Sequence, residues 1–111
     1  MLDQRNLDDL LNLNFLKNIV FLKLPRNNLG NDGVRYIFNS ENLRHIKKID
    51  LSSNQIDSDG AQSIALSTNL PYLEVIDLRV NKIGDMGFKF LIRSETFNNL
   101  RDLRVDMNKI S

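Results

Sequence analysis

Residue types that usually carry chemistry are scarce in this chain of 111 residues. There is no cysteine, which excludes disulfide bonds and thiol chemistry. His45 is the one histidine, no nucleophile motif flanks it, and we interpret it as a solvated loop residue before a strand. The histidine and carboxylate residues show no metal-ligand spacing. We therefore expect no catalysis, no metal and no cofactor.

An excess of charge of one sign and long apolar runs are missing as well. The formal net charge is +1, so nothing favours nucleic acid or an anionic membrane as a partner. No apolar run approaches the roughly 18 residues of a spanning helix, and Asp3, Asp8 and Asp9 interrupt the N-terminal leucines, unlike a signal peptide. The lack of cysteine and of any N-x-S/T sequon fits a reducing compartment. We expect a cytoplasmic location, which for a microbial effector would be the cytosol of a host cell.

What the chain has instead is an internal repeat of 27 residues. Four asparagines stand at this interval. Apolar residues recur five and three residues before each asparagine and two residues after it, and a glycine follows six residues after each of the first three asparagines. Self-similarity at such a period is typical of solenoids and propellers. The four asparagines are Asn27, Asn54, Asn81 and Asn108.

Within each repeat, the hydrophobic periodicity changes from that of a strand to that of a helix. Residues 48–52 alternate polar and apolar with period two, as in a strand with one face in the core. Phe88, Leu91 and Ile92 recur at helical spacing. A repeated strand and helix requires parallel strands joined by crossovers. We predict strands near 21–25, 48–52, 75–79 and 102–106, helices near 3–12, 32–41, 59–68 and 86–95, and helix N-caps at Asn31, Ser58 and Asp85.

The pattern I-x-x-L-x-L-x-x-N-x-L in residues 19–29, 46–56, 73–83 and 100–110 resembles the leucine-rich repeat. The Gly-apolar-x-x-apolar-apolar segment that follows three copies is similar to the ribonuclease-inhibitor-like subfamily. The resemblance implies an α/β fold, a right-handed solenoid (horseshoe) with a parallel concave sheet and outer helices. It also implies that the four asparagines form a ladder of hydrogen bonds to the backbone, so we interpret them as structural residues.

The 27-residue period also sets the boundaries of the repeats. We expect one domain, 1–111, with full repeats at 19–45, 46–72 and 73–99 and a C-terminal half-repeat at 100–111. Residues 1–18 are interpreted as a degenerate N-terminal helical half-repeat, because five leucines fall on the apolar columns of the later helices. The strand near 102–106 then has an uncapped edge. Two explanations stay open: the chain is a fragment of a longer repeat protein, or this edge pairs in a homodimer. The five leucines are Leu2, Leu7, Leu10, Leu11 and Leu16.

The solvent-facing columns of the sheet are the candidate binding surface. In one interpretation, opposite charges such as Lys23 and Asp50 pair across adjacent strands on a solvated face. In the other, exposed apolar residues beside arginines form an interface hot spot. The cross-strand pairs of the first interpretation are Lys23–Asp50, Asp77–Arg104 and Arg79–Asp106. The partner-binding residues of the second are Phe21, Lys48, Asp50, Val75, Asp77, Arg79, Val80, Arg104, Asp106 and Met107.

A second surface lies on the helices. Tyr36 and Phe90 occupy a helix column that Ser63 fills in the middle repeat. Their rings either pack between neighbouring helices or mark a contact on the convex side.

The predicted function is a protein–protein interaction module that binds an unidentified partner through the concave strand face. Two alternatives stay open. Because the ribonuclease-inhibitor-like subfamily includes the Ran GTPase activators, the resemblance also allows a GTPase-activating fragment, with Arg26 as the nearest candidate for an arginine aimed at a nucleotide. The other alternative is a purely structural segment of a longer repeat protein.

Overall fold

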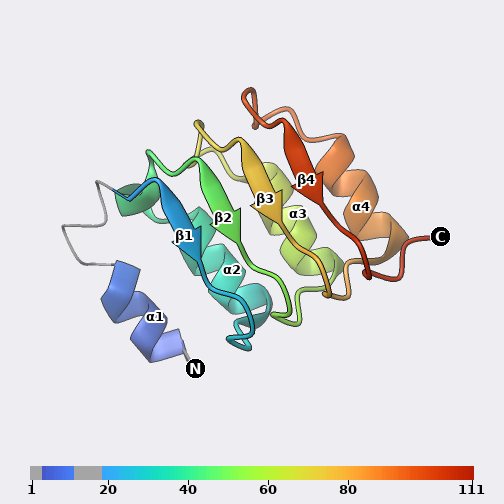
Figure 1. Ribbon diagram of the computed structural model, residues 1–111, viewed down its shortest axis with the longest axis horizontal. Coiled ribbons are helices and arrows are strands. Elements are labelled where there is room, and N and C mark those ends of the chain that lie inside the picture. The colour runs from blue at the N-terminus through green and yellow to red at the C-terminus, as the bar shows by residue number, and fades with distance from the viewer. Residues whose placement is uncertain (1–3, 12–18) are drawn as a thin grey trace.

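The computed structural model describes residues 4–11 and 19–111, and its four strands form one parallel sheet in the order β1-β2-β3-β4 (Figure 1). Strands and helices alternate along the chain, so the predicted α/β solenoid is confirmed. The elements are α1 (Gln4–Leu11), β1 (Phe21–Lys23), α2 (Gly30–Phe38), the 3-10 helix η2 (Glu41–Leu43), β2 (Lys48–Asp50), α3 (Ser58–Leu66), β3 (Val75–Asp77), α4 (Gly84–Ile92) and β4 (Asp102–Arg104).

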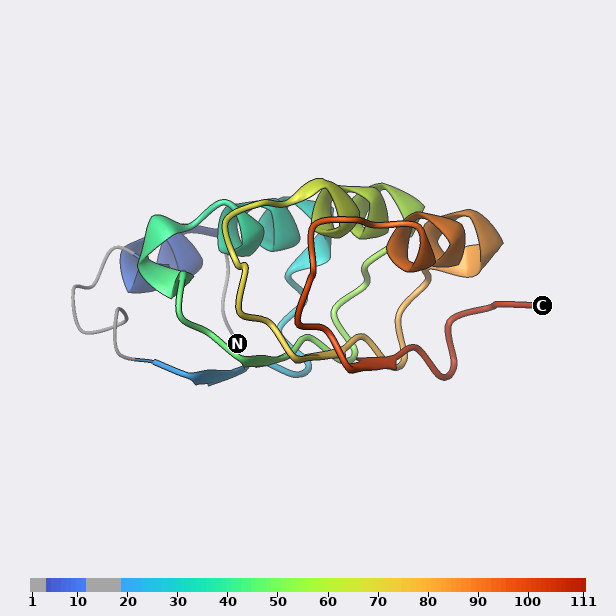
Figure 2. The ribbon, with the colours of Figure 1, turned by 90° about the horizontal axis from the view of Figure 1, so that it is seen from above.

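The molecule has two layers. Figure 2 shows the strands along one side and the helices along the other, with the row of helices bowed outward. The strand side is therefore the inner, concave side of a shallow arc. The apolar faces of the two layers meet between them, where residues such as Ile49, Ile64 and Ile76 are fully buried.

The repeat period sets the strand register. Each strand residue pairs with the residue 27 positions later, so Leu22 lies beside Ile49 and Ile49 lies beside Ile76. The strands are three residues long, two shorter than predicted at each C-terminal end. Parallel-type backbone bonds nevertheless continue into the turn, as in the bond from Leu24 N–H to the Asp50 carbonyl at 2.8 Å. The predicted columns are correct, and only the strand ends differ.

The predicted helix boundaries and N-caps need correction. Helices α2, α3 and α4 begin one or two residues earlier than predicted and end two or three residues earlier. The N-cap residues are Leu29, Asp57 and Ile83 in place of Asn31, Ser58 and Asp85. Of the three observed caps, Asp57 alone accepts a hydrogen bond through its side chain, from the Asp59 N–H at 2.9 Å.

Two of the residues that we predicted as caps connect neighbouring repeats instead. The Asn31 side chain accepts a bond from the Asp57 N–H at 3.1 Å and donates to the Asp57 carboxylate at 2.7 Å. Asp85 accepts from the Ser111 N–H at 2.7 Å. Both side chains lie in the first turn of a helix, where they reach the next repeat more readily than their own helix start.

The glycine column marks places where backbones approach closely. A Cβ on Gly87 would lie 2.5 Å from the Ile83 Cγ2 and 3.1 Å from the Ala61 Cβ. Any side chain there would push α4 away from α3. The sequence-based interpretation of this column as close approach is confirmed.

The asparagines of the repeat connect each turn to the one before it. The Asn54 Oδ1 accepts from the Asn27 N–H at 3.0 Å and from the Leu29 N–H at 3.2 Å. Its Nδ2 donates to the carbonyls of Leu24 at 2.8 Å and Ser52 at 3.0 Å. One fully buried amide therefore satisfies four backbone groups.

The later repeats use the same bonds. The Asn81 Oδ1 accepts from the N–H groups of Asn54 and Ile56 at 2.9 and 3.0 Å. The Asn108 Oδ1 accepts from the Ile83 N–H at 3.2 Å. Asn27, in the first repeat, is half-buried.

A second set of polar side chains does the same at the helix ends, and the sequence analysis missed it. The Ser67 Oγ donates to the Phe38 carbonyl at 2.7 Å, and the Ser94 Oγ donates to the Ala65 carbonyl at 2.7 Å. The last carbonyls of a helix lack partners within it, so these hydroxyls satisfy groups of the preceding repeat. The signal was available, because Ser40, Ser67 and Ser94 also stand 27 residues apart.

At the N-terminal end, α1 covers the core beside α2. Leu7 and Leu11 are buried, and Leu10 packs against the same cluster. Helix α1 is Gln4–Leu11, and residues 3 and 12 of the predicted helix lie outside the described residues. The other two leucines of the predicted half-repeat, Leu2 and Leu16, lie outside the described residues.

Replacing Asn54 with alanine tests the asparagine ladder. The change leaves the Leu29 N–H and the Leu24 carbonyl without the partners that the amide provides, both at buried bonds. Because each unsatisfied buried group costs about 1–3 kcal/mol, the free energy of unfolding should fall by about 2 kcal/mol or more in urea denaturation. Asn99→Ala is the matched control, since it removes an exposed asparagine with one bond, to the Pro71 carbonyl. Equal losses in the two variants would contradict the ladder's role.

Candidate binding surface

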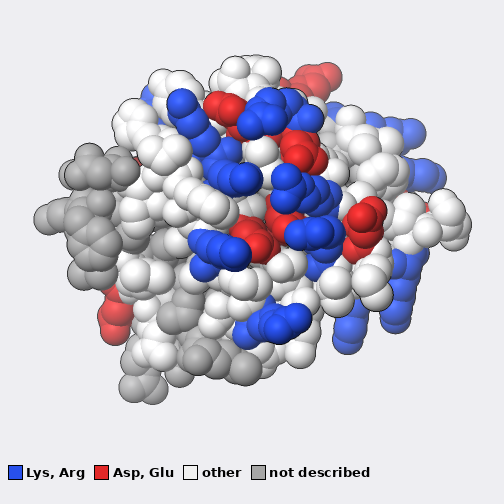
Figure 3. All heavy atoms as spheres, viewed as in Figure 1, with Lys and Arg blue, Asp and Glu red and all other residues white. Residues whose placement is uncertain are grey.

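Charged side chains of both signs gather over the strands. Figure 3 views this face directly and shows basic and acidic groups interleaved there. Two columns of the sheet contribute to them, one through Lys23 and Asp50 and the other through Lys48 and Asp102. The concave face is therefore polar but has no single charge sign.

Two predicted contact residues are buried, so their assignment to the exposed strip is wrong. Val75 is 3% exposed and Asp77 is 4% exposed. Both point away from the main core cluster, but they sit on β3, inside the sheet. Val75 lies between Lys48 and Asp102, whose longer side chains flank it. The Asp77 carboxylate is covered by the Arg79 side chain two residues later.

Asp77 and Arg79 form the best-defined ion pair of the face. The guanidinium donates from Nε to Oδ1 at 3.0 Å and from Nη2 to Oδ2 at 2.7 Å, and the Arg79 N–H adds a bond of 3.1 Å. Burial raises the pKa of Asp77, but these bonds and the charges of Arg79 and Arg104 outweigh it, so the pKa lies below its ordinary value. The same carboxylate raises the pKa of the Arg79 guanidinium. The pair holds Arg79 in one orientation while about half of its side chain stays exposed.

The ion pairs on this face form along a strand and not across it. Arg104 Nε contacts the Asp102 carboxylate at 3.0 Å, again two residues away. Asp50 instead accepts from the Ser52 N–H and Oγ at 2.9 and 2.7 Å. In a strand, residues i and i+2 lie on the same face, which allows these local contacts. The expectation that Lys23–Asp50, Asp77–Arg104 and Arg79–Asp106 form cross-strand ion pairs is therefore wrong for the described residues.

An aromatic residue lies at the first strand. Phe21 is 51% exposed, and the Lys48 Nζ lies 5.2 Å from its ring centroid. This geometry allows a cation–π interaction, which contributes about 0.5–1 kcal/mol at exposed sites. The contact fixes an apolar ring on the solvent side of the sheet.

A shallow groove crosses the sheet just beyond the carboxyl ends of the strands. Its volume is about 460 Å³. Val80 and Met107 supply exposed apolar surface, with 46% and 77% of their area accessible. The groove is lined by two residues from each repeat: Pro25 and Arg26, Ser52 and Ser53, Arg79 and Val80, and Asp106 and Met107.

One of the two columns in this groove has a left-handed backbone. Arg26, Ser53, Val80 and Met107 have φ between 56° and 59°. Non-glycine residues rarely adopt this region, and a β-branched residue such as Val80 is strained there. Sequence analysis did not predict this conformation, because the column contains no glycine or asparagine. Strain of this kind is common at functional sites, and three of these side chains, Arg26, Val80 and Met107, are exposed.

Other kinds of site find little support. Within residues 4–11 and 19–111, no cluster of three or more histidine, cysteine or carboxylate residues could hold a metal ion. In that same part of the chain no helix has the length and apolarity to cross a membrane. His45 is exposed and stacks on Tyr72, with ring centroids 5.6 Å apart. Arg26, the candidate for a GTPase-activating arginine, is exposed at one end of the groove.

Comparison with known proteins supports a repeat fold. A family model described as Leucine Rich repeat matches residues 42–65. Among solved structures, leiomodin-1 actin-binding site 2 superposes with a TM-score of 0.75 at 16% identity, covering 95% of this chain and 60% of that one. A tropomodulin C-terminal domain from Caenorhabditis elegans superposes with a TM-score of 0.71 at 15% identity, covering 95% and 65%. The present chain thus spans less than two thirds of either structure. A search of curated protein sequences found no match.

Val80→Gly and Val80→Ala together test the backbone strain. Both changes remove the same exposed side chain, but only glycine relieves the left-handed conformation, which costs other residues about 1–2 kcal/mol. Glycine also raises the conformational entropy of the unfolded chain, which offsets part of this gain in stability. Val80→Gly should therefore be about 1 kcal/mol more stable than Val80→Ala in urea denaturation. A less stable glycine variant would contradict the strain.

The pH dependence of stability tests the Asp77–Arg79 pair. A lowered pKa means that the Asp77 carboxylate stabilises the fold above its unfolded value of about 3.8, and this contribution is lost as the pH falls below that value. The free energy of unfolding should therefore fall less steeply below pH 4 in Asp77→Asn than in the native chain. Part of the slope will remain, because the Asn31 side chain lowers the pKa of Asp57 as well. Identical slopes in the two proteins would show that the pair contributes nothing.

Proposed function

Because this chain is a leucine-rich-repeat protein, we propose that it is a protein-interaction module that binds a partner protein through its concave strand face. The observation that carries the proposal is the groove beyond the strand ends. There, two exposed apolar side chains, Val80 and Met107, lie beside the oriented guanidinium of Arg79. Apolar anchors with arginine, surrounded by polar residues, are the usual composition of an interface hot spot.

The prearranged side chains favour binding. Arg79 is already held by Asp77, so a partner that contacts it immobilises a side chain that has lost much of its freedom. Ordering a flexible side chain at an interface costs about 0.5–1.5 kcal/mol, and this cost is reduced here. Phe21, placed by Lys48, offers a second anchor on β1, two strands away from the β3 repeat that carries Arg79. At about 4.8 Å per strand, the two anchors are separated by about 10 Å across the sheet.

The proposed contact set is smaller than the sequence predicted. Val75 and Asp77 are covered by neighbouring side chains and support the surface from beneath. The residues that we propose touch the partner are Phe21, Lys48, Asp50, Arg79, Val80, Arg104, Asp106 and Met107.

Actin is a defined first probe for this surface. One of the two similar structures is named as an actin-binding site. At 16% identity the likeness is one of fold, so the name supplies a probe and not an assignment. Direct binding to actin can be measured alongside a search for other partners.

The experiment is affinity capture with the native chain and Val80→Asp/Met107→Asp, with retained proteins identified by mass spectrometry and actin included as a purified arm. Both positions have a left-handed backbone, which aspartate tolerates well, so the variant should fold. Changing Arg79 to glutamate is less suitable, because it would place a second carboxylate against the buried Asp77. Ile92→Asp is the matched control, since Ile92 is 57% exposed on α4.

We expect a partner that the native chain and Ile92→Asp retain and that the strand-face variant loses by about tenfold or more in affinity. Circular dichroism confirms that each variant is folded. Equal capture by all three proteins would place the binding surface elsewhere and refute the proposal.

A further inference from the structure

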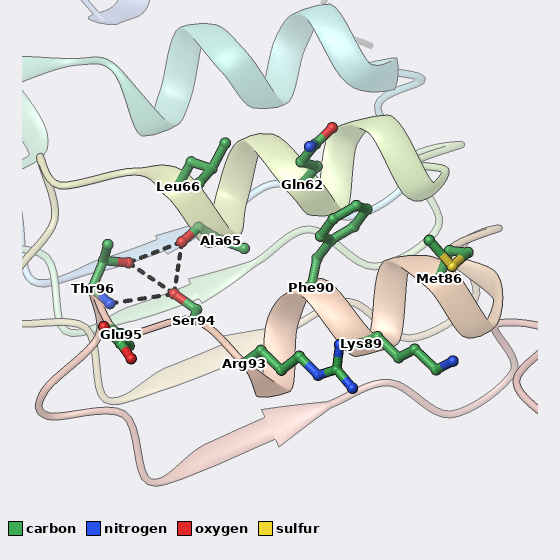
Figure 4. A pocket seen from close by; sticks show the side chains of 10 residues that line it. All are labelled: Gln62, Ala65, Leu66, Met86, Lys89, Phe90, Arg93, Ser94, Glu95 and Thr96. Atoms are coloured by element: carbon green, nitrogen blue, oxygen red, sulfur yellow. Dashed lines mark hydrogen bonds between the residues drawn. The ribbon is translucent and has the colours of Figure 1, made fainter.

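A larger hollow lies on the helix side, between α3 and α4. Its volume is about 650 Å³, and it extends from Met86, near the start of α4, to Thr96, beyond the end of that helix (Figure 4). The helix layer separates it from the strand face, so it is a different surface from the groove at the strand ends. Its lining belongs to no site described above.

The apolar lining of the hollow differs from the matching positions of the other repeats. Leu66 stands where the neighbouring repeats have Asn39 and Arg93, and Met86 stands where the preceding repeats have Asp32 and Asp59. Figure 4 shows the Phe90 ring directed from α4 into the space beside α3, toward Gln62. Ala65 places a small side chain on the α3 wall. The ring of Phe90 and the short side chain of Ala65 thus line the space between the two helices.

The apolar surface of this groove is unusually open. Leu66 is 70% exposed and Met86 is 60% exposed, and the half-buried Phe90 lies with them in the same lining. A single exposed apolar residue needs no explanation, but several that share one groove mark a binding site. Methionine suits such a site because its flexible side chain adapts to a partner.

One edge of the groove is basic. Lys89 and Arg93 are four residues apart on α4, so they lie on the same side of that helix. Both are exposed, and neither forms an ion pair within the described ranges 4–11 and 19–111. Glu95 is the single carboxylate in the lining, and it lies at the far end beside Thr96. A complementary ligand therefore carries apolar groups along its middle and negative charge along one side.

We propose that this groove binds an acidic amphipathic helix of a partner protein. Apolar residues spaced i, i+4 and i+7 would contact Leu66, Phe90 and Met86, and Asp or Glu residues beside them would face Lys89 and Arg93. Helices commonly dock in grooves in this way. The nine residues of α4 span about 14 Å, so the bound helix makes contact over two to three turns.

The test uses a labelled helical peptide of about 16 residues, with leucines at i, i+4 and i+7 and flanking glutamates, and measures fluorescence anisotropy with the whole chain. Two matched peptides replace the leucines with serine or the glutamates with lysine. The protein variants are Lys89→Glu/Arg93→Glu for the basic edge and Leu66→Ser/Met86→Ser for the apolar surface. Val80→Asp/Met107→Asp on the strand face is the control.

We expect saturable binding of the acidic leucine peptide, weakened about tenfold or more by either groove variant and unchanged by the strand-face control. The lysine peptide should bind the charge-reversed protein better than the native one, a result that lost folding cannot imitate. The proposal is overturned if the acidic peptide does not bind, if the serine peptide binds equally well, or if the chain itself self-associates through Leu66 and Met86. The strand face and the helix-side groove are tested with different variants. A failure of peptide binding in the groove can therefore be distinguished from a failure of partner binding at the strand face.

Discussion

The first three strands of this molecule each end in a turn whose peptide N–H groups need acceptors that the turn itself does not supply. Asparagine side chains of the following repeat supply them, as the bonds from Leu29 and Ile56 to Asn54 and Asn81 show. Because each amide connects two repeats, it satisfies the turn and fixes the spacing between repeats at once. Strand register, helix stacking and the position of every surface column depend on this connection. The serine bonds at the helix ends, from Ser67 and Ser94, repeat the principle on the opposite layer.

The period of 27 residues was enough to predict the fold and the columns, because strand pairing joins residues one period apart. It was not enough to predict exposure within a column. Val75 and Asp77 occupy solvent-facing positions but are covered by side chains of adjacent residues, which depends on lengths and rotamers that a pattern does not contain. The predicted N-caps at Asn31 and Asp85 were wrong for a related reason. These side chains form hydrogen bonds to the next repeat, which the spacing alone does not indicate.

Both candidate surfaces arise where repeats differ from one another. The strand-end groove gains its apolar character from Val80 and Met107, in a column that holds Arg26 and Ser53 in the first two repeats. The helix-side groove gains its apolar character from Leu66 and Met86, in columns that hold polar or charged residues in the other repeats. A scaffold whose repeat spacing is held constant by buried amides can vary such positions without losing its fold. The constant residues therefore determine the shape, and the variable ones determine what is bound.

Native-state hydrogen exchange measured by NMR tests the dependence on asparagine most directly. The amide protons of Leu29, Ile56 and Ile83 each donate to an asparagine Oδ1 of the next repeat. If these bonds hold the repeats together, the three protons should exchange only through global unfolding, with a common free energy equal to that from denaturation. Exchange of any of them as fast as exposed loop amides would show that the stack is held together without the asparagine bonds and would contradict the account.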